Sequence, residues 1–119
     1  MPIEISAAFA PGLDTPDHIA LAEHLGYTRA WVYDSPALYH DVWVTLARAA
    51  ERTDRIGLGP GVLVPSLRHP IVNAGAIATL VDLAPGRQRS RECPNAGSSH
   101  APYRCRPRSP ACSCSRETT

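Results

Sequence analysis

The chain has 119 residues, a formal net charge of +1 and 44% hydrophobic residues, which is enough material for one small domain. Its apolar runs are far shorter than the ~18 residues of a membrane-spanning helix, and its N-terminus has no secretory signal, so we expect a cytoplasmic protein without a membrane segment. All 12 basic residues are arginine. The lack of lysine excludes a phosphate-binding loop that ends in Gly-Lys, a Schiff-base lysine and pyridoxal-phosphate chemistry.

The composition changes class after residue 87. Every Val, Ile, Leu, Met, Phe and Trp lies within residues 1–87, whereas all 4 cysteines lie within residues 88–119. A segment without large apolar side chains cannot build a core. We therefore expect residues 1–87 to form the folded part and residues 88–119 to be a disordered, low-complexity Arg/Pro/Ser/Cys tail, and we hypothesise that a frameshift produced this tail.

The first half of the folded part predicts a strand, a helix and a second strand. Apolar residues alternate and then run together over residues 3–9, which predicts the first strand. A helix is predicted from Thr15, whose hydroxyl would cap it, to about Leu25, before a left-handed Gly26. Its buried face is expected to hold Ile19, Leu21, Ala22 and Leu25. Aromatic and β-branched residues predict a second strand over residues 28–33.

The second half repeats this alternation. Asp41 is predicted to cap a second helix, which ends at residues 53–54. Residues 56–65 predict a third strand with glycines at its centre, and Pro70 opens a third helix. The buried stripes are expected to hold Val42, Leu46 and Ala49 in the second helix and Val72, Ala76, Leu80 and Leu83 in the third. Strands separated by such helices imply right-handed crossovers and a parallel sheet, so the fold class is α/β.

Four segments, in their order and spacing, carry a resemblance to a known family. They are residues 30–35 (AWVYDS), 41–47 (DVWVTLA), 57–62 (GLGPGV) and 68–70 (RHP). In this combination residues 1–87 resemble the N-terminal part of the luciferase-like monooxygenase superfamily, in the branch of methylenetetrahydromethanopterin reductase. The resemblance implies the first three βα units of a TIM-type (β/α)8 barrel, left incomplete because a closed barrel needs about 250 residues.

The resemblance also implies a chemistry and a place for it. Relatives transfer a hydride or oxygenate a small-molecule substrate with FMN or coenzyme F420, and the protein orients the cofactor. Sites in such barrels lie at the C-terminal ends of the strands, which here predicts cofactor contacts from Phe9, Asp34, Ser35, Gly61 and Val62. Asp34 matches an acid beside the cofactor in relatives and is the candidate catalytic residue, with a plain turn acid as the alternative.

Two further positions have alternative interpretations. Relatives place a non-prolyl cis peptide bond in the third strand, and the matching bond is Gly61–Val62, with a plain glycine bulge as the alternative. His69, before Pro70, either binds a cofactor phosphate at the helix N-terminus or simply caps the helix. Trp31 and Trp43 are expected in the barrel core rather than as stacking platforms.

The tail leads to a second hypothesis from another class. Its cysteines have spacings unlike those of zinc ligands, so no metal site is expected. We expect the fragment to be inactive alone and prone to association through open sheet edges, and the intact family member to form homo-oligomers. The alternative is a non-enzymatic α/β module whose Arg/Cys tail binds nucleic acid or metal; six arginines are weak support for nucleic acid.

Overall fold

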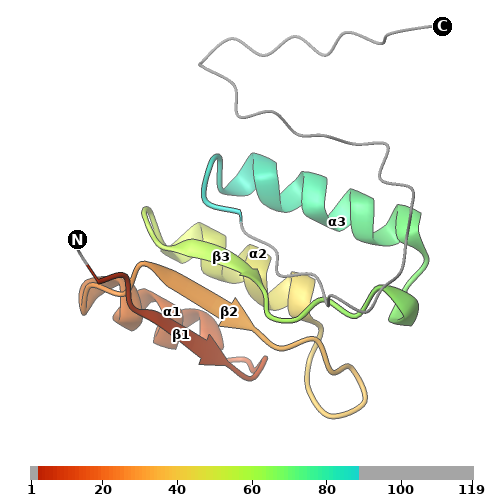
Figure 1. Ribbon diagram of the computed structural model, residues 1–119, viewed down its shortest axis with the longest axis horizontal. Helices are drawn as coiled ribbons and strands as arrows, with labels where there is room; N and C mark the ends of the chain where they lie inside the picture. The colour runs from red at the N-terminus through yellow and green to blue at the C-terminus, as the bar shows by residue number, and fades with distance from the viewer. Residues whose placement is uncertain (1–2, 89–119) are drawn as a thin grey trace, which may run out of the picture.

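Strands and helices alternate along the chain in the computed structural model, which describes residues 3–88 (Figure 1). The order is β1 (Ser6–Phe9), α1 (Thr15–His24), β2 (Arg29–Val32), α2 (Val42–Arg52), β3 (Gly57–Pro60), a 3-10 turn (Pro65–Leu67) and α3 (Pro70–Leu83). The strands pair in parallel in the order β1-β2-β3. The predicted α/β class and element order are therefore confirmed, whereas the predicted tail lies outside the described residues except for Gln88.

The sheet has one face covered by helices and one face without them in the described part of the chain. Figure 1 shows α1 and α2 behind the sheet. Side chains alternate along a strand, so Ala30 and Val32 point toward these helices, where both are fully buried, and Trp31 points to the opposite face. The core between sheet and helices includes Ile19, Ala30, Val32, Val42, Leu46, Ala49, Ile56 and Leu58. Full burial of a Leu or Ile side chain contributes about 1.5–3 kcal/mol.

Helix ends follow local chemistry, with one correction. Gly26 has φ of 91° just after α1, and the Asp41 side chain accepts from two backbone N–H groups of the first turn of α2, as predicted. The predicted cap at Thr15 is wrong. Asp14 is the N-cap residue without a side-chain cap bond, and the buried Thr15 hydroxyl donates instead to the carbonyl of Ala10 at 2.8 Å. Thr15 thus ties α1 to the loop after β1.

Two helices bury only part of the faces predicted for them. Ile19 and Ala22 in α1 and Leu80 in α3 are buried as predicted. Four apolar residues expected in the core are exposed by 39–69%: Leu21, Leu25, Val72 and Leu83. In α3 the buried residues are Asn73 and Leu80, with Ala76 and Ile77 partly buried. The reason is that α3 packs against α2, where the Trp43 indole Nε1 donates to the Asn73 Oδ1 at 3.2 Å, and this contact turns the helix relative to the predicted stripe.

The chain returns to the sheet after α3. The Leu58 N–H donates to the Arg87 carbonyl at 2.9 Å, and Gln88 forms a parallel bridge with Leu58. The Arg87 side chain fixes this return by donating to the Thr53 hydroxyl at 2.9 Å and to the Ala50 carbonyl at 3.1 Å. Gln88 thereby brings the chain alongside β3 after α3.

Candidate functional site

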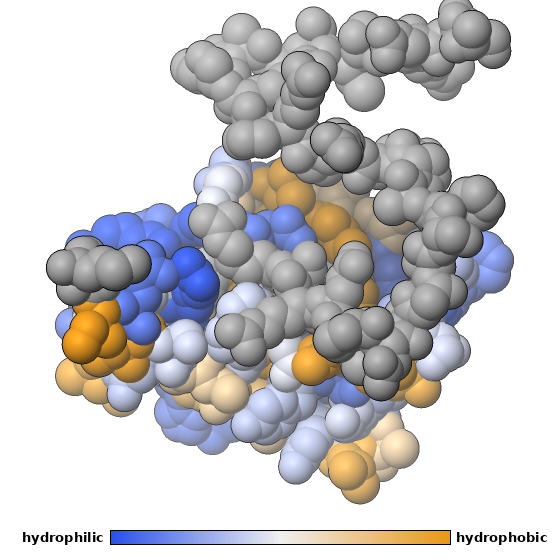
Figure 2. Space-filling view, in the orientation of Figure 1, coloured by the Kyte–Doolittle hydropathy of each residue, from blue (hydrophilic) through white to orange (hydrophobic). Residues whose placement is uncertain are grey.

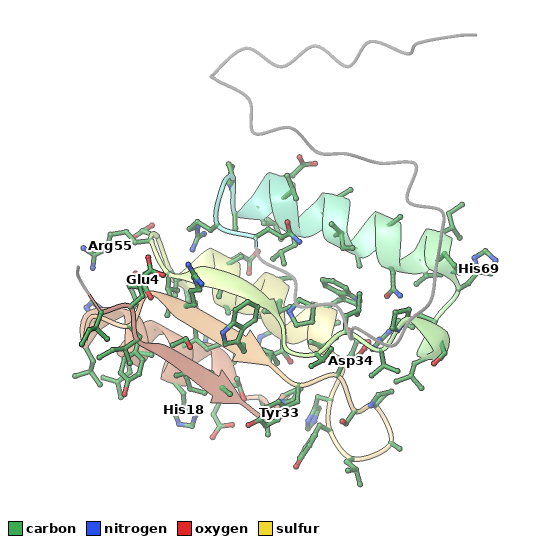
Figure 3. The ribbon with its side chains drawn as sticks, in the orientation of Figure 1. Glu4, His18, Tyr33, Asp34, Arg55 and His69 are labelled. Atoms are coloured by element: carbon green, nitrogen blue, oxygen red, sulfur yellow. The ribbon has the colours of Figure 1, made fainter. Side chains whose placement is uncertain are left out.

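Asp34 lies just beyond β2, at the edge where the strands have their C-terminal ends (Figure 3). Its side chain is 0% exposed. The carboxylate accepts from the Arg68 Nη1 at 2.8 and 2.9 Å and from the Val64 backbone N–H at 3.1 Å. Asp34 is therefore engaged with the segment that follows β3, and it holds that segment against the end of β2.

Arg68 joins Asp34 to a second acid. Its Nη2 donates to the Asp41 Oδ2 at 3.1 Å, and its side chain is only 12% exposed. Burial by itself would lower the pKa of Arg68, but hydrogen bonds to Asp34 and Asp41 outweigh burial and raise it. Burial would likewise raise the pKa of Asp41, but hydrogen bonds from the Val44 N–H, Arg68 and the Trp43 N–H lower it. Asp34, Arg68 and Asp41 form what we call the charge network.

The charge network links three loops at one edge. Asp41 also caps α2 through the N–H groups of Trp43 at 2.8 Å and Val44 at 3.1 Å, so Arg68 connects the end of β2, the start of α2 and the segment before α3. In this geometry Asp34 anchors the segment after β3 at the end of β2. Its catalytic role stays a prediction.

The peptide bond between Gly61 and Val62 is cis, at the bond that the family resemblance indicated. The Gly61 N–H continues the β3 ladder by donating to the Val32 carbonyl at 2.8 Å. A Cβ at Gly61 would lie 2.8 Å from the Trp31 Cβ, which is closer than such atoms approach, and 3.3 Å from the Trp31 Cγ, which is a tight contact. Glycine is thus required here by the close contact with Trp31, and Val62, 41% exposed, follows it at the edge.

The remaining candidate residues are placed as follows. The Phe9 side chain packs against the core, and its carbonyl accepts from the Tyr33 N–H at 3.0 Å. Ser35, partly buried, accepts through its carbonyl from the N–H of Leu38 at 2.9 Å in the turn before α2. His69 is exposed, and its Nδ1 accepts from the Ile71 N–H at 3.3 Å, so the side chain caps α3.

The structure brings some of these residues together and separates others. Asp34 reaches the segment after Val62 through Val64, whereas the Phe9 side chain faces the helices on the other side of the sheet. Sequence analysis missed the role of Arg68. The available signal was a single arginine at the same edge as two acids, one after a strand and one at a helix start.

A cavity lies at the opposite edge of the sheet, where the strands have their N-terminal ends. It measures about 280 Å³ and is lined by Glu23, Gly26, Tyr27, Thr28, Arg55 and Ile56. The Glu23 carboxylate beside it accepts from the backbone N–H groups of Asp54, Arg55 and Ile56, the last two at 2.7 Å. Burial would raise the pKa of Glu23, but these hydrogen bonds and the charge of Arg55 lower it. Glu23 thus fixes the loop before β3.

The His, Cys, Asp and Glu side chains of residues 3–88 form no group of three that would hold a metal ion. None of the helices in this range is long and apolar enough to cross a bilayer.

Comparisons with known proteins agree with this geometry. Residues 7–89 match the family described as luciferase-like monooxygenase. The chain belongs to this family. A 5,10-methylenetetrahydromethanopterin reductase of Methanopyrus kandleri is 41% identical over 78 residues, which are 62% of this chain and 22% of the relative. An F420-dependent glucose-6-phosphate dehydrogenase of Kineococcus radiotolerans is 42% identical over 89 residues, 66% of this chain and 26% of the relative.

A solved structure also matches this luciferase-like chain. It is the coenzyme F420 dependent tetrahydromethanopterin reductase from Methanopyrus kandleri, with a TM-score of 0.67 and 32% identity over 77% of this chain and 27% of that one. The three βα units are therefore the beginning of the barrel fold of this family. The chain spans about a quarter of the length of the relatives it matches.

Proposed function

We propose that this chain supplies part of the cofactor site of an F420-dependent oxidoreductase that acts on a small-molecule substrate. The observation that carries the proposal is the close approach of the Trp31 side chain to the Gly61 backbone, in a segment that Asp34 anchors through the Val64 N–H at the C-terminal edge of the sheet. The names of the relatives favour coenzyme F420, and FMN is the second candidate. Residues 1–87 are proposed as the barrel part and residues 88–119 as a separate tail.

The described residues fit the ring of such a cofactor. Trp31 lies against Gly61 and Val62 follows it in the chain, and both offer partly exposed apolar surface for a flat ring. The basic residues nearest to this edge within residues 3–88, Arg68 and His69, are engaged in the charge network and in capping α3. We therefore propose that this part of the site binds the ring and leaves phosphate binding to other residues.

The bound cofactor would accept or donate a hydride at its ring. The residues of this chain would hold the ring in place: Gly61 and Val62 contact it, and Asp34 and Arg68 keep their segment fixed. Rigid placement of reacting groups is a large part of enzymatic rate enhancement. Hydride transfer, the substrate and the cytoplasmic location stay predictions, as does inactivity of the chain alone.

Binding tests the proposal without requiring turnover. The chain is titrated separately with coenzyme F420 and with FMN, and fluorescence of the ligand is followed. We expect saturable binding to one site per chain, tighter for coenzyme F420. The variant Asp34→Ala should weaken binding because the segment after β3 loses its anchor.

The matched control is Glu23→Gln at the opposite edge, which removes a loop anchor of similar kind and should leave affinity unchanged. Circular dichroism shows whether each variant is folded. Absence of saturable binding by the unaltered chain contradicts the proposal, and so does an equal loss of affinity in the Glu23→Gln variant.

A further inference from the structure

Trp31 stands out on the sheet face that has no helix in the described residues. It pairs with Ala8 of β1 on one side and with Gly59 of β3 on the other. Ala8 and Gly59 are small, so the indole is the large side chain of this row. Figure 2 shows hydrophilic and hydrophobic residues mixed over the coloured surface of the molecule. Trp31 itself is partly exposed.

The indole leans from β2 toward the end of β3. A Cβ built on Gly61 would lie 2.8 Å from the Trp31 Cβ, 3.3 Å from its Cγ and 3.4 Å from its Cε3. Trp31 pairs with Gly59, and Gly61 lies two residues further along the chain. The indole therefore extends from its own place in the register toward the C-terminal ends of the strands. Trp31 therefore supports the backbone that the proposed function assigns to the cofactor ring.

The two tryptophans of the chain have different surroundings. Trp43 is 9% exposed and donates through its indole Nε1 to Asn73 between α2 and α3. Trp31 lies across the sheet from those helices and keeps more exposed surface. An aromatic side chain that keeps part of its surface exposed can place another flat ring against that surface by stacking.

We propose that the Trp31 indole is the floor of the ring site: it supports Gly61 and contacts the ring of a bound flavin or deazaflavin. The inference rests on the proposed function and adds a specificity-determining residue to it. The site would select flat aromatic rings because stacking on an indole rewards any extended π system. Sequence analysis expected only a core role for this residue.

The fluorescence of the two tryptophans provides the test, because the chain has only 2 of them. In the variant Trp43→Phe, Trp31 is the sole indole, and its quenching by acrylamide is measured from emission lifetimes with and without saturating FMN. We expect the quenching constant of Trp31 to fall about twofold or more, because a bound ring would cover most of the indole surface that acrylamide can reach. In the matched variant Trp31→Phe, quenching of Trp43 should not change when FMN binds.

Affinity supplies an independent measurement on the same chain. Trp31→Leu should weaken FMN binding about tenfold, because leucine offers no π face on which the ring can stack. Trp31→Phe should keep most of the affinity that Trp31→Leu loses, because phenylalanine still offers a planar ring for stacking. A purely space-filling role would predict similar affinities for the two variants. If Trp43→Phe fails to fold, subtraction of Trp31→Phe emission from that of the unaltered chain isolates Trp31.

The outcomes separate the two proposals. Binding of FMN with unchanged acrylamide quenching of Trp31, or with equal affinity of Trp31→Leu and Trp31→Phe, overturns this inference and leaves the proposed function standing. No saturable binding of FMN or coenzyme F420 to the unaltered chain overturns both.

Discussion

Removal of the Asp34 carboxylate should destabilise the fold strongly. The Asp34 side chain is 0% exposed, and the variant Asp34→Ala would leave Arg68, 12% exposed, without its closer partner and the Val64 N–H without its acceptor. Breaking a buried ion pair by deleting one partner costs about 3–5 kcal/mol. Arg68 keeps Asp41 at 3.1 Å, so we expect the lower end of the range, about 3 kcal/mol.

That loss is a large share of the total stability of a small domain, which is about 5–15 kcal/mol. Urea unfolding followed by circular dichroism measures it as a lower midpoint at unchanged slope. The double variant Asp34→Leu/Arg68→Met should recover much of the loss, because it leaves no unpaired charge at the buried position, and Asp41, which also loses Arg68, is 44% exposed to water.

The matched control breaks an exposed ion pair of the same chain. Arg29 and Glu4 are 41% and 59% exposed and lie 2.6 Å apart, so Glu4→Ala should cost less than about 1 kcal/mol. The reasoning is refuted if Asp34→Ala costs no more than Glu4→Ala, or if the double variant is less stable than Asp34→Ala.

Three further predictions concern other positions. Gly61→Ala should destabilise the chain by about 1–3 kcal/mol and shift the emission of Trp31, because the new Cβ would overlap the Trp31 side chain. The control Gly75→Ala, with open space around it in α3, should stabilise the chain by about 0.5–1 kcal/mol. Equal urea midpoints for the two variants would contradict this prediction. The folded-state pKa of Glu23 is lowered from 4.5, so its contribution is present above about that pH and is lost as pH falls through the folded-state value. Urea midpoints at pH 6 and pH ~3.5 should therefore differ less in Glu23→Gln than in the unaltered chain, and an identical difference would refute the assignment. Asp41→Ala should lower the thermal midpoint, because loss of the α2 cap costs about 1 kcal/mol of unfolding free energy. Asp41→Asn, which can still cap, should lower the midpoint less, and the reverse order would disprove the capping argument.

Features that depend on a few neighbouring residues could be predicted from the sequence. Asp41 caps α2 and Gly26 ends α1 because the requirements of a helix end are local. The alternation of strand and helix patterns likewise predicted the parallel order, since right-handed crossovers leave few other arrangements. The position of the Gly61–Val62 bond came from the family resemblance.

Features that depend on how elements lie against one another could not be predicted. Leu25 and Val72 have the spacing of buried residues, yet they are exposed because the faces that α1 and α3 bury depend on the angle at which each packs. Thr15 has the residue type of a cap, but a carbonyl five positions away is its partner. Periodicity gives the stripe that can be buried, and packing decides which part of it is.

The sequence alone determined the α/β class, the three βα units and the edge at which the candidate residues gather, because hydrophobic period, capping and crossover handedness act locally or through topology. Only the tertiary structure decided the task of each residue at that edge. Asp34 and Arg68 are 34 positions apart, and nothing in their local sequence shows that the arginine turns toward the acid instead of toward a ligand. The Trp31 side chain and the Gly61 backbone meet because β2 and β3 are neighbouring parallel strands, and that contact depends on a register that is set only when the strands pair.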